Sequence, residues 1–294
     1  MMWVNAVFLP LERRIQMDYS AADIEAAMNL QLSMHLYTAL ATFWTYDYAC
    51  SLEQEWIFLF RSRWTKVKGL YIVTRHVPFF LIMDLLVFTS NDSPDKCRVL
   101  SSIYSCFALI SLTCSECFFV LRTYSLLNRN KIILTAMMTS LFATTASTVA
   151  IFFTTIPTSY VTTSAIPGIT GCYRSSNTVE VLLPFLLMFA FQLGLICLTL
   201  TCVIRTWRST RSPLYAILAK HNIFYYATGL LFSIVNILMP LLALDSAYLT
   251  VLEDLQVFIL AILATRMHLY LWRIDRRSPY HTCDTDHRDT NRAF

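Results

Sequence analysis

The ionisable residues within or at the edge of otherwise apolar stretches of the sequence include Asp47, Arg75, Glu116 and Arg266. A charged side chain at the centre of a bilayer costs about 2.5–3.5 kcal/mol on insertion scales, so it needs a partner or has a function. At about 1.5 Å per helical residue, the last three lie at a similar depth from one end of their stretches. We therefore expect the four residues to form an ion-paired network, which either stabilises the fold or opens as a switch.

A second set of polar residues follows helical spacing in two other apolar stretches. Spacings that alternate between three and four residues place a set on one face of a helix. In a membrane, small and polar residues belong where helices pack against one another. This set has two interpretations, bundle packing or the lining of a ligand cavity. Its members are His35, Thr38 and Thr42 in one stretch, and Tyr226, Ser233 and Asn236 in the other.

The composition identifies the elements that must position these residues. Of the 294 residues, 56% are hydrophobic and only 14% are charged, and the mean hydropathy is +0.53. A soluble domain has about 25% charged residues, whereas a membrane-spanning helix needs about 20 mostly apolar ones. We predict an all-α, polytopic membrane protein whose bundle covers residues 24–272. Its seven expected spans are 24–46, 67–88, 99–121, 132–153, 179–204, 217–242 and 248–271.

Lys and Arg are concentrated after the first, third and fifth stretches and in the C-terminal tail. Because cytoplasmic loops are enriched in these residues, we expect the N-terminal segment 1–23 outside and the polar tail 273–294 in the cytoplasm. The outer loop between the fourth and fifth spans, 154–177, is rich in Ser and Thr and is expected to be irregular. The net charge of +4 is too small and too scattered to indicate nucleic-acid binding.

Two cysteines, Cys97 and Cys172, fall on the predicted outer side of the membrane. Disulfides persist in such an oxidising compartment. A bridge would tether the outer loop to the start of the third span, and the alternative is a pair of free thiols. We expect the bridge, an arrangement that is similar to the one in rhodopsin-like receptors.

A resemblance to a known family rests on spaced residues along most of the chain. It resembles a fungal, chiefly basidiomycete, group of membrane proteins that carry an N-terminal domain of unknown function 6533. His76 departs from the pattern, because that group usually has Tyr after the Arg. The resemblance implies a seven-helix membrane protein and no established activity. The residues that carry it are Tyr46, Asp47, Tyr48, Leu52, Glu55, Trp64, Lys68 and Arg75, then Glu116, Leu121-Arg122-Thr123-Tyr124 and Arg266-Met267.

Three functions remain open from the sequence. We rank first a receptor-like sensor of an outer ligand, with a cytoplasmic signalling partner at the basic inner loops. A small-solute transporter ranks second, because no internal repeat is visible. An intramembrane enzyme acting on lipid ranks third, because no two His residues stand four apart on one expected span. No cofactor is expected, since the last span has no Lys to form a Schiff base with retinal.

Overall fold

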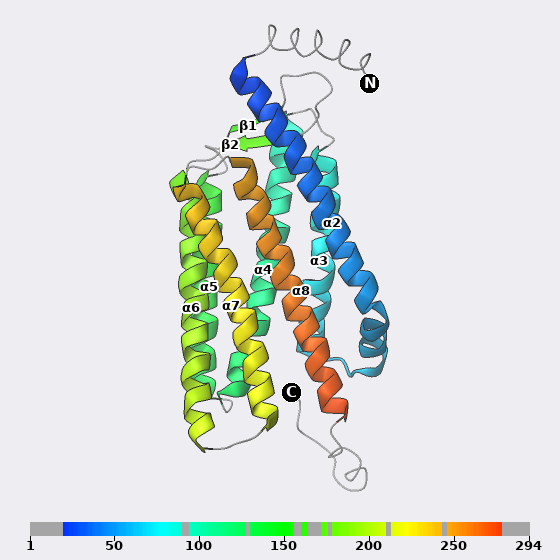
Figure 1. Cartoon of the computed structure of the whole chain (residues 1–294), viewed down its shortest axis with the longest axis vertical. Helices are drawn as coiled ribbons and strands as arrows, with labels where there is room; N and C mark the ends of the chain where they lie inside the picture. The colour runs from blue at the N-terminus through cyan, green and yellow to red at the C-terminus, as the bar shows by residue number, and fades with distance from the viewer. Residues whose placement is uncertain are drawn as a thin grey trace, which may run out of the picture.

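The computed structural model describes residues 20–89, 94–127, 130–155, 160–163, 172–175, 178–209, 213–242 and 246–277. Within these ranges the chain forms seven long helices, which run alongside one another in an elongated bundle (Figure 1). The first helix begins at the end of the bundle that carries two short strands, and the last helix ends at the opposite end (Figure 1). The helices are α2 (Ala21–Arg61), α3 (Lys66–Thr89), α4 (Pro94–Leu126), α5 (Lys131–Thr155), α6 (Thr178–Ser209), α7 (Pro213–Leu241) and α8 (Ser246–Arg277).

Helix α2 has a well-defined start and is longer than the span predicted for this region. The hydroxyl of Ser20 accepts a hydrogen bond from the backbone N–H of Asp23, and the Asp23 carboxylate accepts one from the backbone N–H of Ser20, both at 3.2 Å. This reciprocal capping box satisfies two otherwise free donors. The helix then continues through Tyr46, the expected end of the span, to Arg61. No Gly or Pro occurs between these two residues to interrupt it.

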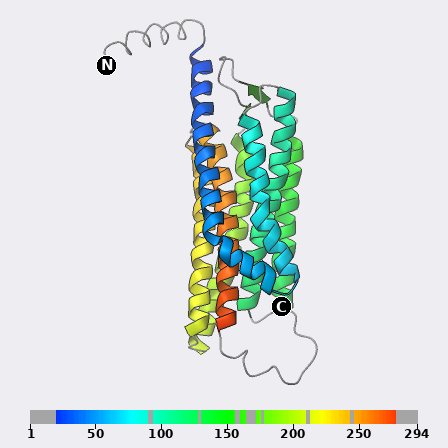
Figure 2. The ribbon, with the colours of Figure 1, turned by 90° about the vertical axis from the view of Figure 1, so that its right-hand side faces the viewer.

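Helices α4 and α8 form the centre of the bundle. Helix α4 contacts α3, α5, α6, α7 and α8, and α8 contacts α2, α3, α4 and α7. One apolar core joins α2, α3 and α8 through Trp44, Leu81 and Phe258. A second core joins α4 to α8 and to the remaining helices through residues such as Phe119 and Leu260. Figure 2 shows the same bundle from the side, with α2 leaning across its neighbours in its lower part.

The segment between α5 and α6 contains regular structure where the sequence led us to expect none. Strands β1 (Tyr160–Thr163) and β2 (Cys172–Ser175) form an antiparallel pair, with Tyr160 opposite Ser175 and Thr163 opposite Cys172. The first strand consists of Tyr, Val and two Thr residues, which favour extended backbone. The expectation of an irregular loop was therefore wrong for these two segments, because Thr, which is frequent in this loop, also favours extended backbone.

Five of the described helices are long and apolar enough to cross a membrane: α4, α5, α6, α7 and α8. This property identifies the chain as a membrane protein. Helices α2 and α3 are not among the five when only the described residues are considered. These two helices carry most of the buried charges of the bundle, and buried charges lower the hydropathy of a helix without facing lipid.

Candidate functional site

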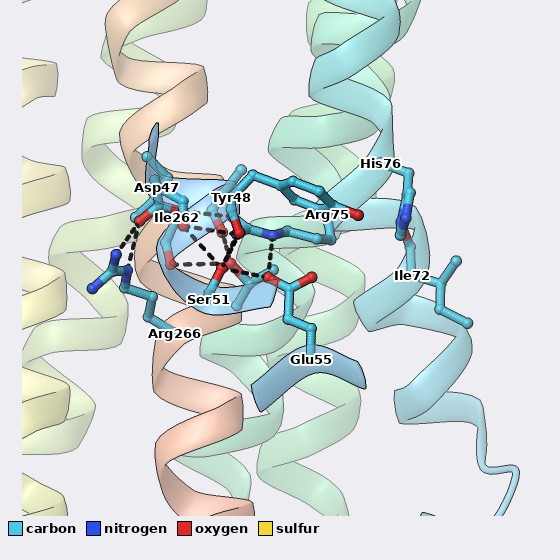
Figure 3. Close-up of polar contacts among 11 residues, drawn as sticks. Asp47, Tyr48, Ser51, Glu55, Ile72, Arg75, His76, Ile262 and Arg266 are labelled. Carbon is cyan, nitrogen blue, oxygen red and sulfur yellow. Dashed lines mark hydrogen bonds and ion pairs between the residues drawn. The ribbon is translucent and has the colours of Figure 1, made fainter. Parts of the chain in front are cut away.

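A cluster of four charged side chains joins α2, α3 and α8 (Figure 3). Arg75 of α3 lies 2.7 Å from the Asp47 carboxylate through Nη1 and 2.6 Å from the Glu55 carboxylate through Nε. Arg266 of α8 reaches the other oxygen of Asp47, and its Nε and Nη2 atoms both lie at 2.6 Å. Asp47 is therefore shared between two arginines that come from two different helices.

The acidic side of the cluster is built by the spacing of one helix. Asp47, Ser51 and Glu55 are four residues apart in α2, so they lie on one face of that helix. The Ser51 hydroxyl donates to Glu55 at 2.7 Å and accepts a hydrogen bond from Arg75. Helix α2 can supply all three groups only because it continues beyond Tyr46.

The Arg75 guanidinium is also enclosed by aromatic rings. Its central carbon lies 5.1 Å from the ring centroid of Trp44 and 5.2 Å from that of Tyr48. A guanidinium over an aromatic face gains a cation–π attraction that increases when water is excluded. Arg75 is fully buried, so these rings replace part of the hydration that the cation loses.

The charges of the cluster balance, but its members differ in burial. Two carboxylates face two guanidinium groups. The side chains of Arg75, Asp47 and Glu55 are at most 5% exposed, whereas that of Arg266 is 51% exposed. Water and ions screen a half-exposed pair, so the Arg266–Asp47 contact contributes less to stability than the buried pairs. The cluster thus has a permanent inner part and a weaker outer connection to α8.

Below the cluster, Lys68 connects the end of α2 to the start of α3. Its ammonium donates to the backbone carbonyls of Leu59 at 2.7 Å and Ser62 at 2.9 Å, and it lies 4.6 Å from the ring centroid of Trp64. The last carbonyls of a helix have no partner within the helix, and a cation at this end also interacts favourably with the helix dipole. Lys68 therefore fixes the turn that places Arg75 opposite Asp47.

We expect Lys68→Met to lower the free energy of unfolding by about 2 kcal/mol, because hydrogen bonds from a charged group are worth about 1.5–3 kcal/mol. Thermal unfolding of the purified protein in detergent measures the change. Lys66→Met is the matched control, since Lys66 begins the same helix and is exposed. Equal losses in the two variants would contradict the assigned role of Lys68.

Glu116 does not lie in the network in which the sequence placed it. The structure brings Asp47, Arg75 and Arg266 together, but the Glu116 carboxylate accepts a hydrogen bond from Gln192 of α6 at 2.7 Å. Depth along a helix does not determine which face a residue occupies, and Glu116 lies on the side of α4 that faces α6. The glutamate that pairs with Arg75 is Glu55, not Glu116 as predicted.

The residues considered for a cavity divide into two groups in the structure. His35, Thr38 and Thr42 are exposed on the outer surface of α2, and the two Thr hydroxyls donate to backbone carbonyls of their own helix at 2.8 Å. Such local hydrogen bonds let a Thr face outward without a partner on another helix. Because these three side chains face outward, their positions give no support to the second interpretation, the lining of a ligand cavity.

The set on α7 is buried and hydrogen-bonded to other helices. Tyr226 donates to the carbonyl of Phe119 in α4 at 2.7 Å, and its hydroxyl also contacts Thr123. Ser233 donates to Gln192, and Asn236 donates to Gln256 of α8. These contacts agree with the packing interpretation for Tyr226, Ser233 and Asn236.

Ser51, Gln192 and Gln256 were not predicted from the sequence, and Glu55 entered only through the resemblance. The sequence does contain a signal for Ser51, because Asp47, Ser51 and Glu55 follow one another at intervals of four residues. This signal lies beyond Tyr46, where the predicted span ends. Nothing in the sequence alone indicated that Gln192 and Gln256 would be joined through a residue of α7.

The predicted cysteine pair is described only in part. Cys97 lies in the first turn of α4 and is fully buried, and it is not among the free cysteines. Cys172 is the first residue of β2, opposite Thr163 of β1, and β1 contacts α4. The side chain of Cys172 lies outside the described residues, so the bridge stays a prediction.

Residues 35–80 match a family of unknown function, DUF6533. The matched segment covers the lower part of α2, the Lys68 turn and most of α3, and it contains Asp47, Glu55 and Arg75. Arg266 lies outside it. No match is found among curated proteins.

Proposed function

We propose that the chain is a seven-span, receptor-like membrane protein in which the charged cluster holds α8 against α2 and α3. The seven described helices each cover one of the predicted spans, apart from a final residue of the sixth. The first helix begins and the last ends at opposite ends of the bundle (Figure 1), as an odd number of crossings requires. The positive-inside rule then assigns the end with the charged cluster to the cytoplasm.

The inclusion of α2 and α3 as spans is supported by where their charges lie. Asp47, Glu55 and Arg75 are buried, and Arg75 forms an ion pair with each of the two carboxylates. The bilayer contacts only the outer surface of a bundle, so paired charges inside it do not prevent a helix from spanning. Apolar side chains such as Phe43, Phe80 and Met83 are exposed on the outer surface of these two helices.

The shared carboxylate of Asp47 is the observation that carries the receptor-like proposal. One of its oxygens faces the fully buried Arg75 and the other faces the half-exposed Arg266. Movement of α8 would break the weaker contact and leave Asp47, Glu55 and Arg75 with one net negative charge. That charge favours return of Arg266 or capture of a basic group of a cytoplasmic partner. A ligand at the outer end that binds the open form better would shift this equilibrium.

Hydrogen exchange of the full-length protein in detergent, followed by mass spectrometry, tests this mechanism. In Arg266→Gln, we expect faster exchange in the lower halves of α2 and α8, because the contact between them is lost. Arg61→Gln, an exposed basic residue in the last turn of α2, is the matched control. A ligand of the proposed receptor should reproduce the Arg266→Gln pattern in the unmodified protein. Unchanged exchange in Arg266→Gln would contradict the proposal that the charged cluster holds α8 against α2 and α3.

The proposal also includes an outer disulfide between Cys97 and Cys172. Mass mapping of alkylated peptides under non-reducing conditions should show these two peptides linked. Loss of the bridge in Cys97→Ser should lower stability by about 4 kcal/mol on the loop-entropy scale, because the bridge closes a long loop. Cys106→Ser, a free and exposed thiol of the same helix, should leave stability nearly unchanged. Alkylation of both Cys97 and Cys172 without reduction would exclude the bridge.

A further inference from the structure

Glu116 is a fully buried carboxylate that belongs to no ion pair among the described residues. Its Oε1 atom accepts the 2.7 Å hydrogen bond from Gln192, while its Oε2 atom is buried without a hydrogen-bond partner in the described part of the chain. The nearest guanidinium along α4, that of Arg122, is hydrogen-bonded to His268 instead. A buried, ionised carboxylate with one unsatisfied oxygen is energetically unfavourable unless a proton or a cation binds there.

A relay of hydrogen bonds between side chains of α6, α7 and α8 ends at this carboxylate of α4. Gln192 donates to Glu116, Ser233 donates to Gln192 at 2.9 Å, Gln256 donates to Ser233 at 3.0 Å, and Asn236 donates to Gln256 at 2.6 Å. Each side chain therefore points its donor along the relay toward Glu116.

The carboxylate sets the direction of the whole relay. An ionised carboxylate only accepts, so the amide of Gln192 must turn its N–H toward it and its oxygen toward Ser233. Ser233 has a single proton, which goes to Gln192, and its oxygen is then free to accept from Gln256. Hydrogen bonds aligned in this way polarise one another and concentrate positive potential at the last acceptor. The relay thus stabilises a negative charge on Glu116.

The path of the relay depends on a glycine. A Cβ atom at Gly229 of α7 would lie 3.3 Å from Nε2 of Gln192 and 3.3 Å from a methyl group of Leu260. The missing side chain therefore gives the Gln192 amide room beside α7, from which it reaches Glu116.

We propose that Glu116 binds a small monovalent cation, such as Na⁺, at its unpaired Oε2 atom inside the helix bundle. The relay favours the ionised carboxylate, and no basic side chain of the described residues neutralises it, so a mobile cation supplies the missing charge. One carboxylate matches one positive charge, whereas Ca²⁺ sites usually gather several acidic ligands. This site is separate from the charged cluster of α2, α3 and α8.

The test measures thermal unfolding of the purified full-length protein in detergent at constant pH and ionic strength, while NaCl replaces choline chloride. A cation that binds only the folded state raises the Tm in proportion to the logarithm of its concentration above Kd. We expect a higher Tm in NaCl than in choline chloride for the unmodified protein. Glu116→Gln should abolish this difference, because the neutral amide attracts no cation. Glu53→Gln, the same change at an exposed position of α2, should retain it.

Ser233→Ala provides a second variant in case Glu116→Gln does not fold. It keeps the carboxylate but interrupts the relay, so a higher concentration of NaCl should be needed for the same rise in Tm. Thr228→Ala on the same helix is its control, since that hydroxyl donates only to a carbonyl of its own helix. Equal Tm values in NaCl and choline chloride for the unmodified protein would overturn the proposal. A sodium effect that survives in Glu116→Gln, or is unchanged in Ser233→Ala, would also overturn it.

Discussion

Arg75→Met is expected to lower the free energy of unfolding by about 3–5 kcal/mol, the usual effect of removing one partner of a buried ion pair. The substitution leaves Glu55 buried without a cationic partner among the described residues, although the hydroxyl of Ser51 still donates to it. Asp47 retains Arg266 and is less affected. Thermal unfolding in detergent, or the yield of folded protein after solubilisation, measures the loss.

A second substitution, at Glu55, is expected to restore part of the stability. Glu55→Gln removes the charge that Arg75→Met leaves unpaired, so the double variant should regain part of the loss. Glu55→Gln alone should also be destabilising, because Arg75 then carries excess positive charge. A double-mutant cycle over the four proteins isolates the coupling energy, which we expect to be at least about 2 kcal/mol.

Arg266→Met is the control for these variants. Its side chain is 51% exposed, so its removal should cost no more than about 1 kcal/mol in stability. If Arg75→Met and Glu55→Gln have simply additive effects, the two residues are not energetic partners. If Arg266→Met is as destabilising as Arg75→Met, the division into an inner part and an outer connection is wrong.

The helices could be predicted from the sequence because hydrophobic length is a property of the chain itself. About 20 apolar residues are needed for each span, and each predicted stretch, apart from residue 242, lies in one described helix. The end of α2 at Arg61 was not predicted, because the charge of Asp47 interrupts the apolar stretch directly after Tyr46. A charge that finds its partner inside the bundle does not end a helix, and partners on other helices are invisible in a local pattern.

The composition of the candidate site could be predicted only in part. Asp47, Arg75 and Arg266 could be predicted to form ion pairs because isolated charges are unfavourable in a membrane. Their pairing depends on how the helices are rotated, which spacing along a single helix does not determine. Glu116 shows the consequence, since it has a similar depth but faces α6. His35 shows the opposite case, in which a polar residue with helical spacing lies on the outer surface.

Trp44→Ala is expected to destabilise the protein by about 3–5 kcal/mol, the range for removing a large aromatic side chain from a core. Trp44 is fully buried, and its ring packs edge-on against Phe79 of α3 at 6.0 Å and Phe258 of α8 at 5.5 Å between centroids. The truncation opens a cavity where three helices meet and removes one of the two rings that face Arg75.

Two further variants separate the contributions of the Trp44 side chain. Trp44→Phe should be much less destabilising than Trp44→Ala, because the indole N–H has no hydrogen-bond partner among the described residues and an aromatic ring is kept. Trp56→Ala on the same helix is the matched control, since Trp56 is 61% exposed, and it should change the Tm little. Comparable losses of Tm in Trp44→Ala and Trp56→Ala would mean that α2 does not pack against α3 and α8 through Trp44, and the position of the charged cluster beneath it would then be wrong as well.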